Sequence, residues 1–131
     1  MEDILGLLEM PDTTVAIVGA TDNPDKYGYL IYRDLKRKGF SIFPVNQNRE
    51  TVDDDTAFKT LAEIPEAPTV VNIVVPPEET LHILQQCLEL GLMNVWLQPG
   101  TESAANLTFL QEHPFHYLAN TCIMVQSRLK V

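Results

Sequence analysis

The sequence predicts an α/β fold with a doubly wound, mostly parallel sheet, formed by a single domain over residues 1–131. Short, apolar, β-branched runs alternate along the chain with stretches of helical spacing, which is the pattern of strands joined by crossover helices. The runs are apolar on both faces, as the strands of a buried parallel sheet are. The length suits one domain, and residues 1–10 predict a short helix packed on its outside.

The first half of the chain predicts two strands and one helix. Residues 14–18 are a β-branched strand, and residues 27–38 are a helix, because their apolar positions recur at helical spacing up to Gly39. Residues 41–45 are the next strand. Pro44 lies inside it and cannot donate a ladder hydrogen bond, so this strand should stop pairing there or run along an edge of the sheet.

The second half continues the alternation. Residues 56–64 predict a short helix or turn, and residues 70–75 predict an unbroken apolar strand. Pro76 and Pro77 then open a helix that ends at Gly91, because proline suits a first helical turn and the acidic residues that follow suit its positive end. The same reasoning predicts a strand, a helix and a last short strand at residues 94–97, 102–111 and 117–118.

The charge balance narrows the class of partner. Nine Lys and Arg against eighteen Asp and Glu give a formal net charge of −9, which disfavours a nucleic-acid or anionic-membrane surface, because both need clustered cations. The acidic N-terminus lacks the basic region of a signal peptide, and no apolar run approaches the roughly 18 residues of a membrane span. Cys87 and Cys122 have no metal-ligand spacing. We therefore expect a cytoplasmic protein with free thiols.

Four strand ends carry the candidate binding residues, because ligands of a doubly wound sheet bind at the carboxyl ends of its strands. At the first, Gly19 permits a tight turn, and the amides after it can face a phosphate. Thr21 stands where the dinucleotide motif G-x-G-x-x-G has its second glycine, so the segment does not match that motif. Lys26 holds a pyrophosphate oxygen or is solvated, and both interpretations stay open. The candidates here are Gly19, Ala20, Thr21, Asn23, Lys26 and Tyr27.

The second strand end carries Val45, Asn46 and Arg49. Sites for NAD have Asp or Glu at this strand end to accept the ribose hydroxyl, whereas this chain has Asn46. An amide tolerates a nearby phosphate, and the guanidinium of Arg49 is able to pair with one. The segment therefore favours a phosphorylated ribose over NAD. The alternative is a polar loop with a solvated arginine.

The third and fourth strand ends offer apolar and polar contacts. Val75 and Pro76 form either a rigid ledge, against which adenine or a pantetheine arm can lie, or only a turn from strand to helix. Trp96 stacks on a ligand or belongs to the core. Gln98 is placed to hydrogen-bond the same ligand, and Gly100 closes the segment.

Taken together in this order and spacing, these segments resemble the small stand-alone CoA-binding domain family, whose Rossmann-like fold is shared with the α subunit of succinyl-CoA synthetase. The resemblance covers roughly residues 10–131. It implies a pyrophosphate at Gly19 to Thr21, adenosine near Val45 and Asn46, and a pocket wall at Pro76. The matching stretches are residues 15–20 with Asn23 and Pro24, residues 39–40 with 44–46, residues 76–78, residues 96–100, and residues 122–125 with 128–129.

The predicted function is non-catalytic binding of CoA or an acyl-CoA through its ADP portion. The histidines at 82, 113 and 116 lack a paired carboxylate at metal spacing, so neither a metal site nor a catalytic constellation is predicted. One alternative is the CoA-carrying component of a multi-chain acyl-CoA ligase or acyltransferase, with a separate enzyme partner. Another is a regulatory module that binds NAD(P) or another nucleotide, with Cys122 as a redox sensor. A homodimer and a role in protein association alone also stay open.

Overall fold

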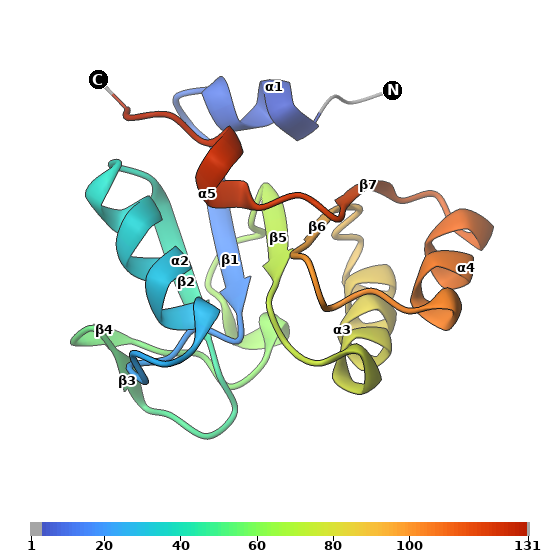
Figure 1. The fold of residues 1–131 in the computed structure, drawn as a ribbon, viewed down its shortest axis with the longest axis horizontal. Helices are drawn as coiled ribbons and strands as arrows, with labels where there is room; N and C mark the ends of the chain where they lie inside the picture. The colour runs from blue at the N-terminus through green and yellow to red at the C-terminus, as the bar shows by residue number, and fades with distance from the viewer. Residues whose placement is uncertain (1–3, 131) are drawn as a thin grey trace.

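A five-stranded sheet forms the centre of the computed structural model, which describes residues 4–130 (Figure 1). All its strands are parallel, and their order is β2-β1-β5-β6-β7. The chain moves outward from β1 to β2 and then returns to build the other half beside β1, which confirms the doubly wound α/β fold. The strands are β1 (Thr14–Val18), β2 (Ser41–Val45), β5 (Val70–Ile73), β6 (Asn94–Leu97) and β7 (His116–Ala119).

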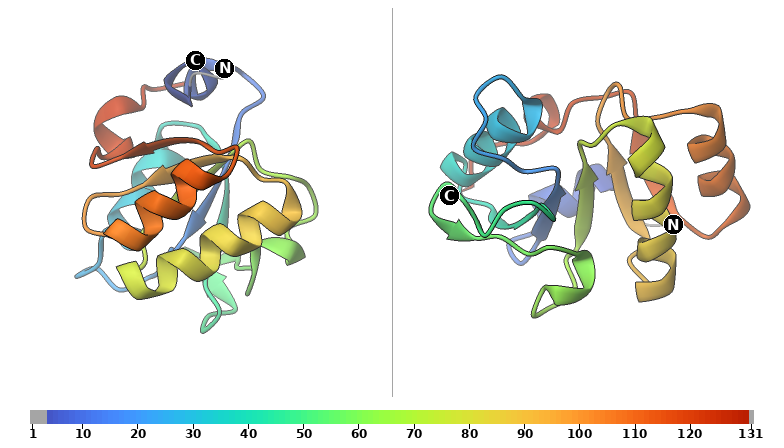
Figure 2. Two further views of the ribbon diagram at one scale, coloured as in Figure 1. Left: turned by 90° about the vertical axis from the view of Figure 1, so that its right-hand side faces the viewer. Right: turned by 90° about the horizontal axis from the view of Figure 1, so that it is seen from below.

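Helices cover both faces of the sheet (Figures 1 and 2). One face carries α1, α2 and α5, which span Ile4–Glu9, Tyr27–Arg37 and Ile123–Gln126. The other face carries α3 and α4, which span Pro77–Leu90 and Ala104–Glu112 and pack side by side. None of the helices within the described residues has the length and apolar character that a bilayer crossing requires.

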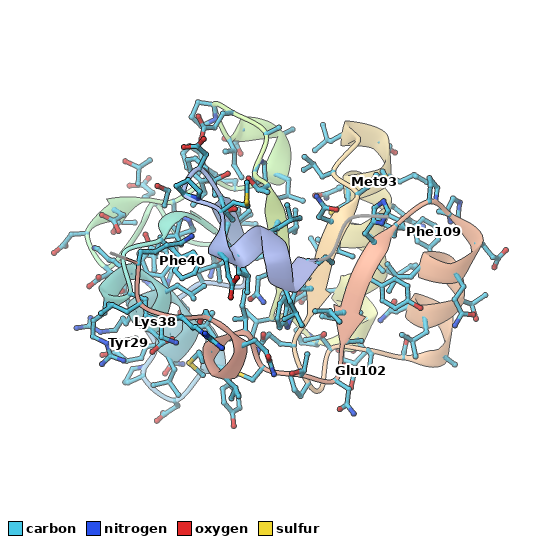
Figure 3. All side chains as sticks on the ribbon, turned by 90° about the horizontal axis from the view of Figure 1, so that it is seen from above. Tyr29, Lys38, Phe40, Met93, Glu102 and Phe109 are labelled. Atoms are coloured by element: carbon cyan, nitrogen blue, oxygen red, sulfur yellow. The ribbon has the colours of Figure 1, made fainter. Side chains whose placement is uncertain are left out.

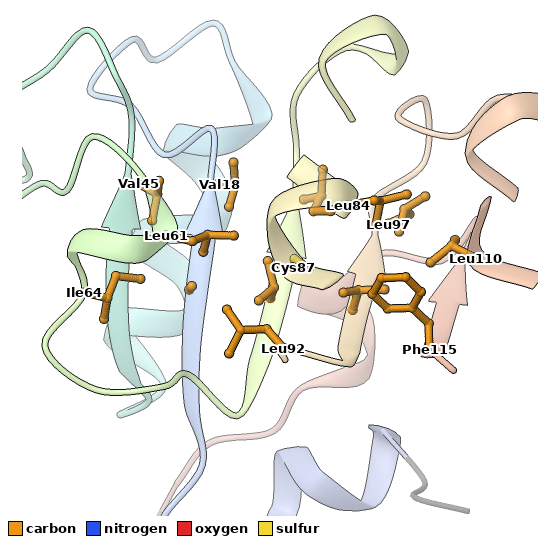
Figure 4. Close-up of a cluster of buried hydrophobic side chains, with 14 residues drawn as sticks. Val18, Val45, Leu61, Ile64, Leu84, Cys87, Leu92, Leu97, Leu110 and Phe115 are labelled. Carbon is orange, nitrogen blue, oxygen red and sulfur yellow. The ribbon is translucent and has the colours of Figure 1, made fainter. Parts of the chain in front are cut away.

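The central strands are apolar on both sides because both sides are core. In β1, Val15 and Ile17 pack towards α2, whereas Ala16 and Val18 pack towards α3. Figure 4 shows the second of these clusters, in which Leu84 and Cys87 of α3 meet the sheet. Alternation of side chains along a strand sends every second residue to the opposite face. A run with no polar position is therefore the expected signature of a strand with helices above and below it.

Pro44 lies in an edge strand, as the sequence predicts. β2 is the first strand in the sheet order and pairs with β1 through its whole length, so Pro44 stands opposite Ile17. On its outer side the carbonyl oxygen of Pro44 accepts a hydrogen bond from the N–H of Phe58 at 2.9 Å, and the N–H of Asn46 donates to the carbonyl of Phe58 at 2.9 Å. This short parallel bridge between residues 45 and 58 fixes the stretch after the hairpin beside the end of β2.

Residues 51–64 follow the prediction only in part, because the short helix or turn predicted for residues 56–64 is shorter and a hairpin precedes it. Only η1, a 3₁₀ helix at Leu61–Glu63, is helical in the stretch predicted as helix or turn. Before it, β3 (Thr51–Val52) and β4 (Asp55–Thr56) form a hairpin whose turn residues 53 and 54 have positive φ. Strands of two residues are too short to show an alternating pattern, so the sequence gives no signal for them. The short α5 also escaped prediction, and residues 1–3 of the predicted N-terminal helix lie outside the described residues.

The hairpin is fastened to α2 by a cluster of polar contacts. The hydroxyl of the buried Tyr32 donates to Asp55 at 2.6 Å, and Lys36 donates to Asp55 and Asp53 at 2.9 and 3.0 Å. Arg33 pairs with Asp53 at 3.0 Å. Hydrogen bonds from Tyr32 and then Lys36 lower the pKa of Asp55, whereas burial, followed by the hydrogen bond to Asp55, raises the pKa of Tyr32.

A second set of contacts holds the C-terminal segment across the ends of α1 and α2 (Figure 3). Lys38 donates to the carbonyl of Met124 at 2.8 Å and to the hydroxyl of Ser127 at 3.0 Å. Lys130 donates to the carbonyl oxygens of Leu8 and Met10, each at 2.7 Å. The ends of the described chain are therefore tied to one another as well as to the sheet.

We expect Tyr32→Phe to lower the free energy of unfolding at pH 7 by about 1 kcal/mol, because it removes one hydrogen bond to a charged carboxylate at a partly exposed site. The pKa of Asp55 is lowered in the folded state. Its contribution is therefore present above the ordinary carboxyl range near pH 4 and is lost as the pH falls through its folded-state pKa. The difference between wild type and Tyr32→Phe should shrink between pH 7 and pH 3 in urea unfolding curves. A difference that stays constant with pH would contradict this account.

Candidate functional site

A cavity of about 430 Å³ opens where the order of the strands reverses. Its walls are the carboxyl ends of β1 and β2, the stretch before η1, the loop after β5, and one side of α3. The floor is apolar, since Val18 and Val45 belong both to the cavity and to the buried cluster of Figure 4. In an open α/β sheet this is the position at which ligands bind.

Gly19 turns the chain sharply at the end of β1. Its φ is +106°, and a Cβ at this position would lie 2.8 Å from the carbonyl oxygen of Val74. The backbone here is also fixed by hydrogen bonds on both sides, because Gly19 N–H donates to the carbonyl of Val45 and Val74 N–H donates to the carbonyl of Val18, each at 2.9 Å. Only glycine fits a turn with this φ and this close an approach.

Gly28 brings the first turn of α2 against the same loop. A Cβ on Gly28 would lie 2.0 Å from the carbonyl oxygen of Gly19, so the helix and the loop touch backbone to backbone. Lys26 is the N-cap residue and makes no side-chain capping hydrogen bond. The N–H groups of the first turn, of which that of Tyr29 donates to the carbonyl of Lys26, and the positive end of the helix dipole therefore lie next to the turn at Gly19. This is the arrangement that attracts an anion. The role of Gly28 comes from this tertiary contact and from no local motif in the sequence.

The loop between Thr21 and Lys26 is held by its own side chains. Thr21 Oγ1 accepts from the N–H of Asn23 at 3.2 Å, and Asn23 Oδ1 accepts from the N–H of Asp25 at 3.0 Å. Asn23, Lys26 and Tyr27 are exposed at the start of α2. These three residues lie beside the anion-attracting end of the helix rather than on the cavity wall.

Asn46 joins the ends of β1 and β2 through both ends of its amide. Its Nδ2 donates to the carbonyl of Ala20 at 2.9 Å, and its Oδ1 accepts from the N–H of Asn48 at 2.9 Å. A carboxylate at this position would face the Ala20 carbonyl oxygen and repel it. The local packing therefore favours an amide here, which adds a structural reason to the ligand-based one for the missing acidic residue.

Arg49 is turned away from the cavity and towards the loop after β1. Its Nη1 pairs with Asp22 at 3.3 Å, and its Nε donates to Thr21 Oγ1 at 3.3 Å. The other carboxylate oxygen of Asp22 accepts from the backbone N–H of Asp53 in the hairpin turn at 2.8 Å. Arg49 thus takes part in the attachment of the hairpin to this loop and already has an anionic partner.

The residues that follow β5 reach the cavity, whereas the candidates that follow β6 do not. Val75 lines it, and Pro76, the N-cap residue of α3, follows directly. Gln98 is buried beneath α5, where its Oε1 accepts from Asn72 Nδ2 at 3.1 Å and from the N–H of Ile123 at 2.9 Å. Gly100 lies in the exposed turn that follows. Neither Gln98 nor Gly100 is among the described residues on the cavity wall.

The aromatic and thiol candidates have structural contacts. Trp96 is fully buried, and its Nε1 donates to the carbonyl of Thr121 at 2.8 Å, so it belongs to the core. Cys122 is half-buried, and its Sγ accepts from Gln98 Nε2 at 3.3 Å. Burial raises the pKa of Cys87 to about 12. Both thiols are free, and no group of three or more metal-binding side chains is found in residues 4–130.

The cavity also has polar residues that the sequence analysis missed. Glu79, His82 and Gln86 recur along one side of α3 and face it, and Lys59 lies on the opposite wall. The three helical positions share a face by their spacing alone, but the sequence does not say which face meets the cavity. Lys59 was not among the predicted binding residues, because its segment was predicted as a helix or turn and not as a strand end. Of the predicted residues, the cavity gathers Gly19, Val45, Asn46 and Val75.

A parallel sheet with a glycine turn at its switch point, next to the open end of a helix, defines the class of Rossmann-like domains that bind nucleotide-containing ligands. Comparison with known proteins gives the family. Residues 13–128 match the family model described as CoA binding domain. The chain belongs to this family, which confirms the resemblance seen in the sequence.

Relatives in this family include both enzyme subunits and small proteins. The α subunit of an ADP-forming acetate–CoA ligase from Pyrococcus furiosus is 35% identical over 82 residues, which are 62% of this chain and 18% of that subunit. An uncharacterized protein of Bacillus subtilis, YneT, is 25% identical over 85% of this chain and 82% of its own length. The structure of a conserved hypothetical protein from Pyrococcus furiosus has a TM-score of 0.85 at 36% identity, covering 88% of this chain and 99% of that one.

We expect Gly28→Ala to cost about 3 kcal/mol or more of unfolding free energy, because its Cβ meets a backbone carbonyl that cannot move without shifting β1. Gly91→Ala is the matched control. Unlike Gly28, Gly91 has a positive φ, but nothing lies within 4 Å of its added Cβ, so that change should cost only about 1 kcal/mol. Chemical denaturation of both variants measures the difference, and equal losses would contradict the close approach of α2 to the loop.

Proposed function

We propose that this domain binds CoA or an acyl-CoA through its ADP portion and does not itself catalyse a reaction. The observation that carries the proposal is the continuity of the site. The open end of α2 lies against the turn at Gly19, and the cavity of about 430 Å³ begins at that same turn. A pyrophosphate at the helix end would therefore extend directly into a space with an apolar floor.

Each part of the ADP portion has a matching environment. The pyrophosphate is proposed to lie at Gly19, Ala20 and Thr21, where the amides after β1 and the first turn of α2 meet. The ribose is proposed to lie beside Asn46, and adenine against Val45 and Val75. Small ligands with one flat apolar group and a few fixed polar groups commonly occupy cavities of this kind. The acyl end would then leave the cavity past Pro76.

The side chains of Gln98 and Cys87, which could in principle take part in catalysis, have structural roles instead, and this supports a binding role for the domain. The side-chain amide of Gln98 is already hydrogen-bonded to Asn72, Ile123 and Cys122. Burial keeps Cys87 protonated at neutral pH, because its pKa is about 12. We therefore assign no catalytic residue to the domain. Any group transfer on a bound CoA would be carried out by residues of another protein.

A second candidate function follows from the relatives. A ligase α subunit matches this chain over 62% of its length, and the chain spans 18% of that subunit. The domain would then deliver CoA to a separate catalytic chain. Affinity purification of the tagged protein at its native expression level separates the two candidates. Stoichiometric recovery of a separate catalytic chain would favour the carrier role, and recovery of the protein alone would favour simple binding.

Ligand-dependent thermal unfolding tests the proposed function directly. A ligand that binds only the folded state stabilises it by about 2.7 kcal/mol at 100 times its Kd, which raises the Tm of a domain of this size by several degrees. We expect CoA and acetyl-CoA to raise the Tm and NAD to leave it unchanged, with NADP and ADP as further comparisons. A rise with NAD alone, or with none of these ligands, would contradict the proposal.

A variant that fills the cavity tests its location. Val75→Trp should abolish the rise in Tm with CoA, because the indole occupies space that Val75 leaves open at the cavity wall. Val125→Trp is the matched control, since Val125 is 77% exposed on α5 and does not line the cavity. A Val75→Trp protein that folds and still responds to CoA would move the site elsewhere.

A further inference from the structure

The basic residue on the cavity wall is Lys59, and not the Arg49 that the sequence indicated. Arg49, the expected partner of a ribose phosphate, is paired with Asp22 and bonded to Thr21 instead. Lys59 lies on the cavity wall. Among the described residues that line the cavity, Lys59 carries the positive charge, His82 offers a ring N–H, and Glu79 is the carboxylate.

The position of Lys59 follows from backbone contacts. The N–H of Asn46 donates to the carbonyl of Phe58 at 2.9 Å, and the two segments of the chain run parallel there. Lys59 is the next residue along, so its backbone emerges beside Asn46 at the mouth of the cavity. The bridge therefore sets a lysine next to the place proposed for the ribose.

The opposite wall is formed by α3, from which Glu79 and His82 face the cavity. These positions are three apart and so lie on one side of the helix. No lysine or arginine occurs in the sequence between Lys59 and Arg128. Among the described residues that line the space between β2 and α3, the positive charge available to a ligand is therefore that of Lys59, while His82 offers a ring N–H and Glu79 opposes an anion.

We propose that Lys59 and His82 bind the 3′-phosphate on the ribose of CoA, and that this contact selects 3′-phosphorylated adenine nucleotides over those without this phosphate. The inference rests on the proposed function, because the ADP portion must lie across Gly19 for its ribose to reach Asn46. The phosphate then accepts charge-assisted hydrogen bonds from Nζ of Lys59 and from a ring N–H of His82. Glu79 weakens the same contact by like-charge repulsion.

The test compares the Kd of CoA with that of 3′-dephospho-CoA by isothermal titration calorimetry. Lys59→Gln should weaken CoA binding about tenfold and leave 3′-dephospho-CoA binding within about twofold, because one charge-assisted contact is worth roughly that factor. His82→Asn should show the same selectivity. Glu79→Gln should have the opposite effect and lower the Kd of CoA but not that of 3′-dephospho-CoA. The preference for CoA should also fall as salt rises, since the charges are exposed.

Arg37→Gln is the charge-matched control, because Arg37 is 79% exposed on α2 and does not line the cavity. Equal losses for both ligands in Lys59→Gln, or a loss of selectivity in Arg49→Gln instead, would overturn the assignment of the phosphate to Lys59. Wild type that binds both ligands equally would overturn it too, with the proposed function intact. Wild type that binds neither would overturn the proposed function itself.

Discussion

The contact on which the site depends is the backbone approach of α2 to the turn after β1. Gly28 meets the carbonyl of Gly19, and Gly19 in turn meets the carbonyl of Val74 at the end of β5. Three elements from both halves of the sheet thus converge where no side chain fits. This convergence sets the helix end beside the turn and leaves the cavity open on the other side of the loop. A wider spacing would move the first-turn amides away from any ligand in the cavity.

The second constraint is the set of polar contacts that fix the surrounding loops. Asn46 ties the end of β2 to Ala20. Asp22 forms an ion pair with Arg49 and accepts a hydrogen bond from the N–H of Asp53 in the hairpin turn. The hairpin is held in turn by Tyr32 and the cations of α2. These contacts explain why so many of the basic residues in a chain of net charge −9 are already paired. They also leave Lys59 as the cation that the cavity can offer to a ligand.

Membership of the CoA-binding domain family and the continuity of the site point in the same direction. The family match covers residues 13–128, and the cavity lies at the switch point of the sheet, where the fold class places its ligands. The relatives include both a ligase subunit and chains of about this length. Domains of this family therefore occur both inside larger enzymes and in small proteins.

The sequence by itself determined the alternation of strands and helices, the two-sided core, the edge position of Pro44 and the turn at Gly19. These features are encoded within single elements, by the period of the apolar residues and by the special geometry of proline and glycine. Only the tertiary structure decided what faces the cavity. Lys59 reaches it through a bridge between residues 45 and 58, whereas Arg49 is drawn to Asp22. Such contacts join segments far apart in the chain, so no local pattern specifies them.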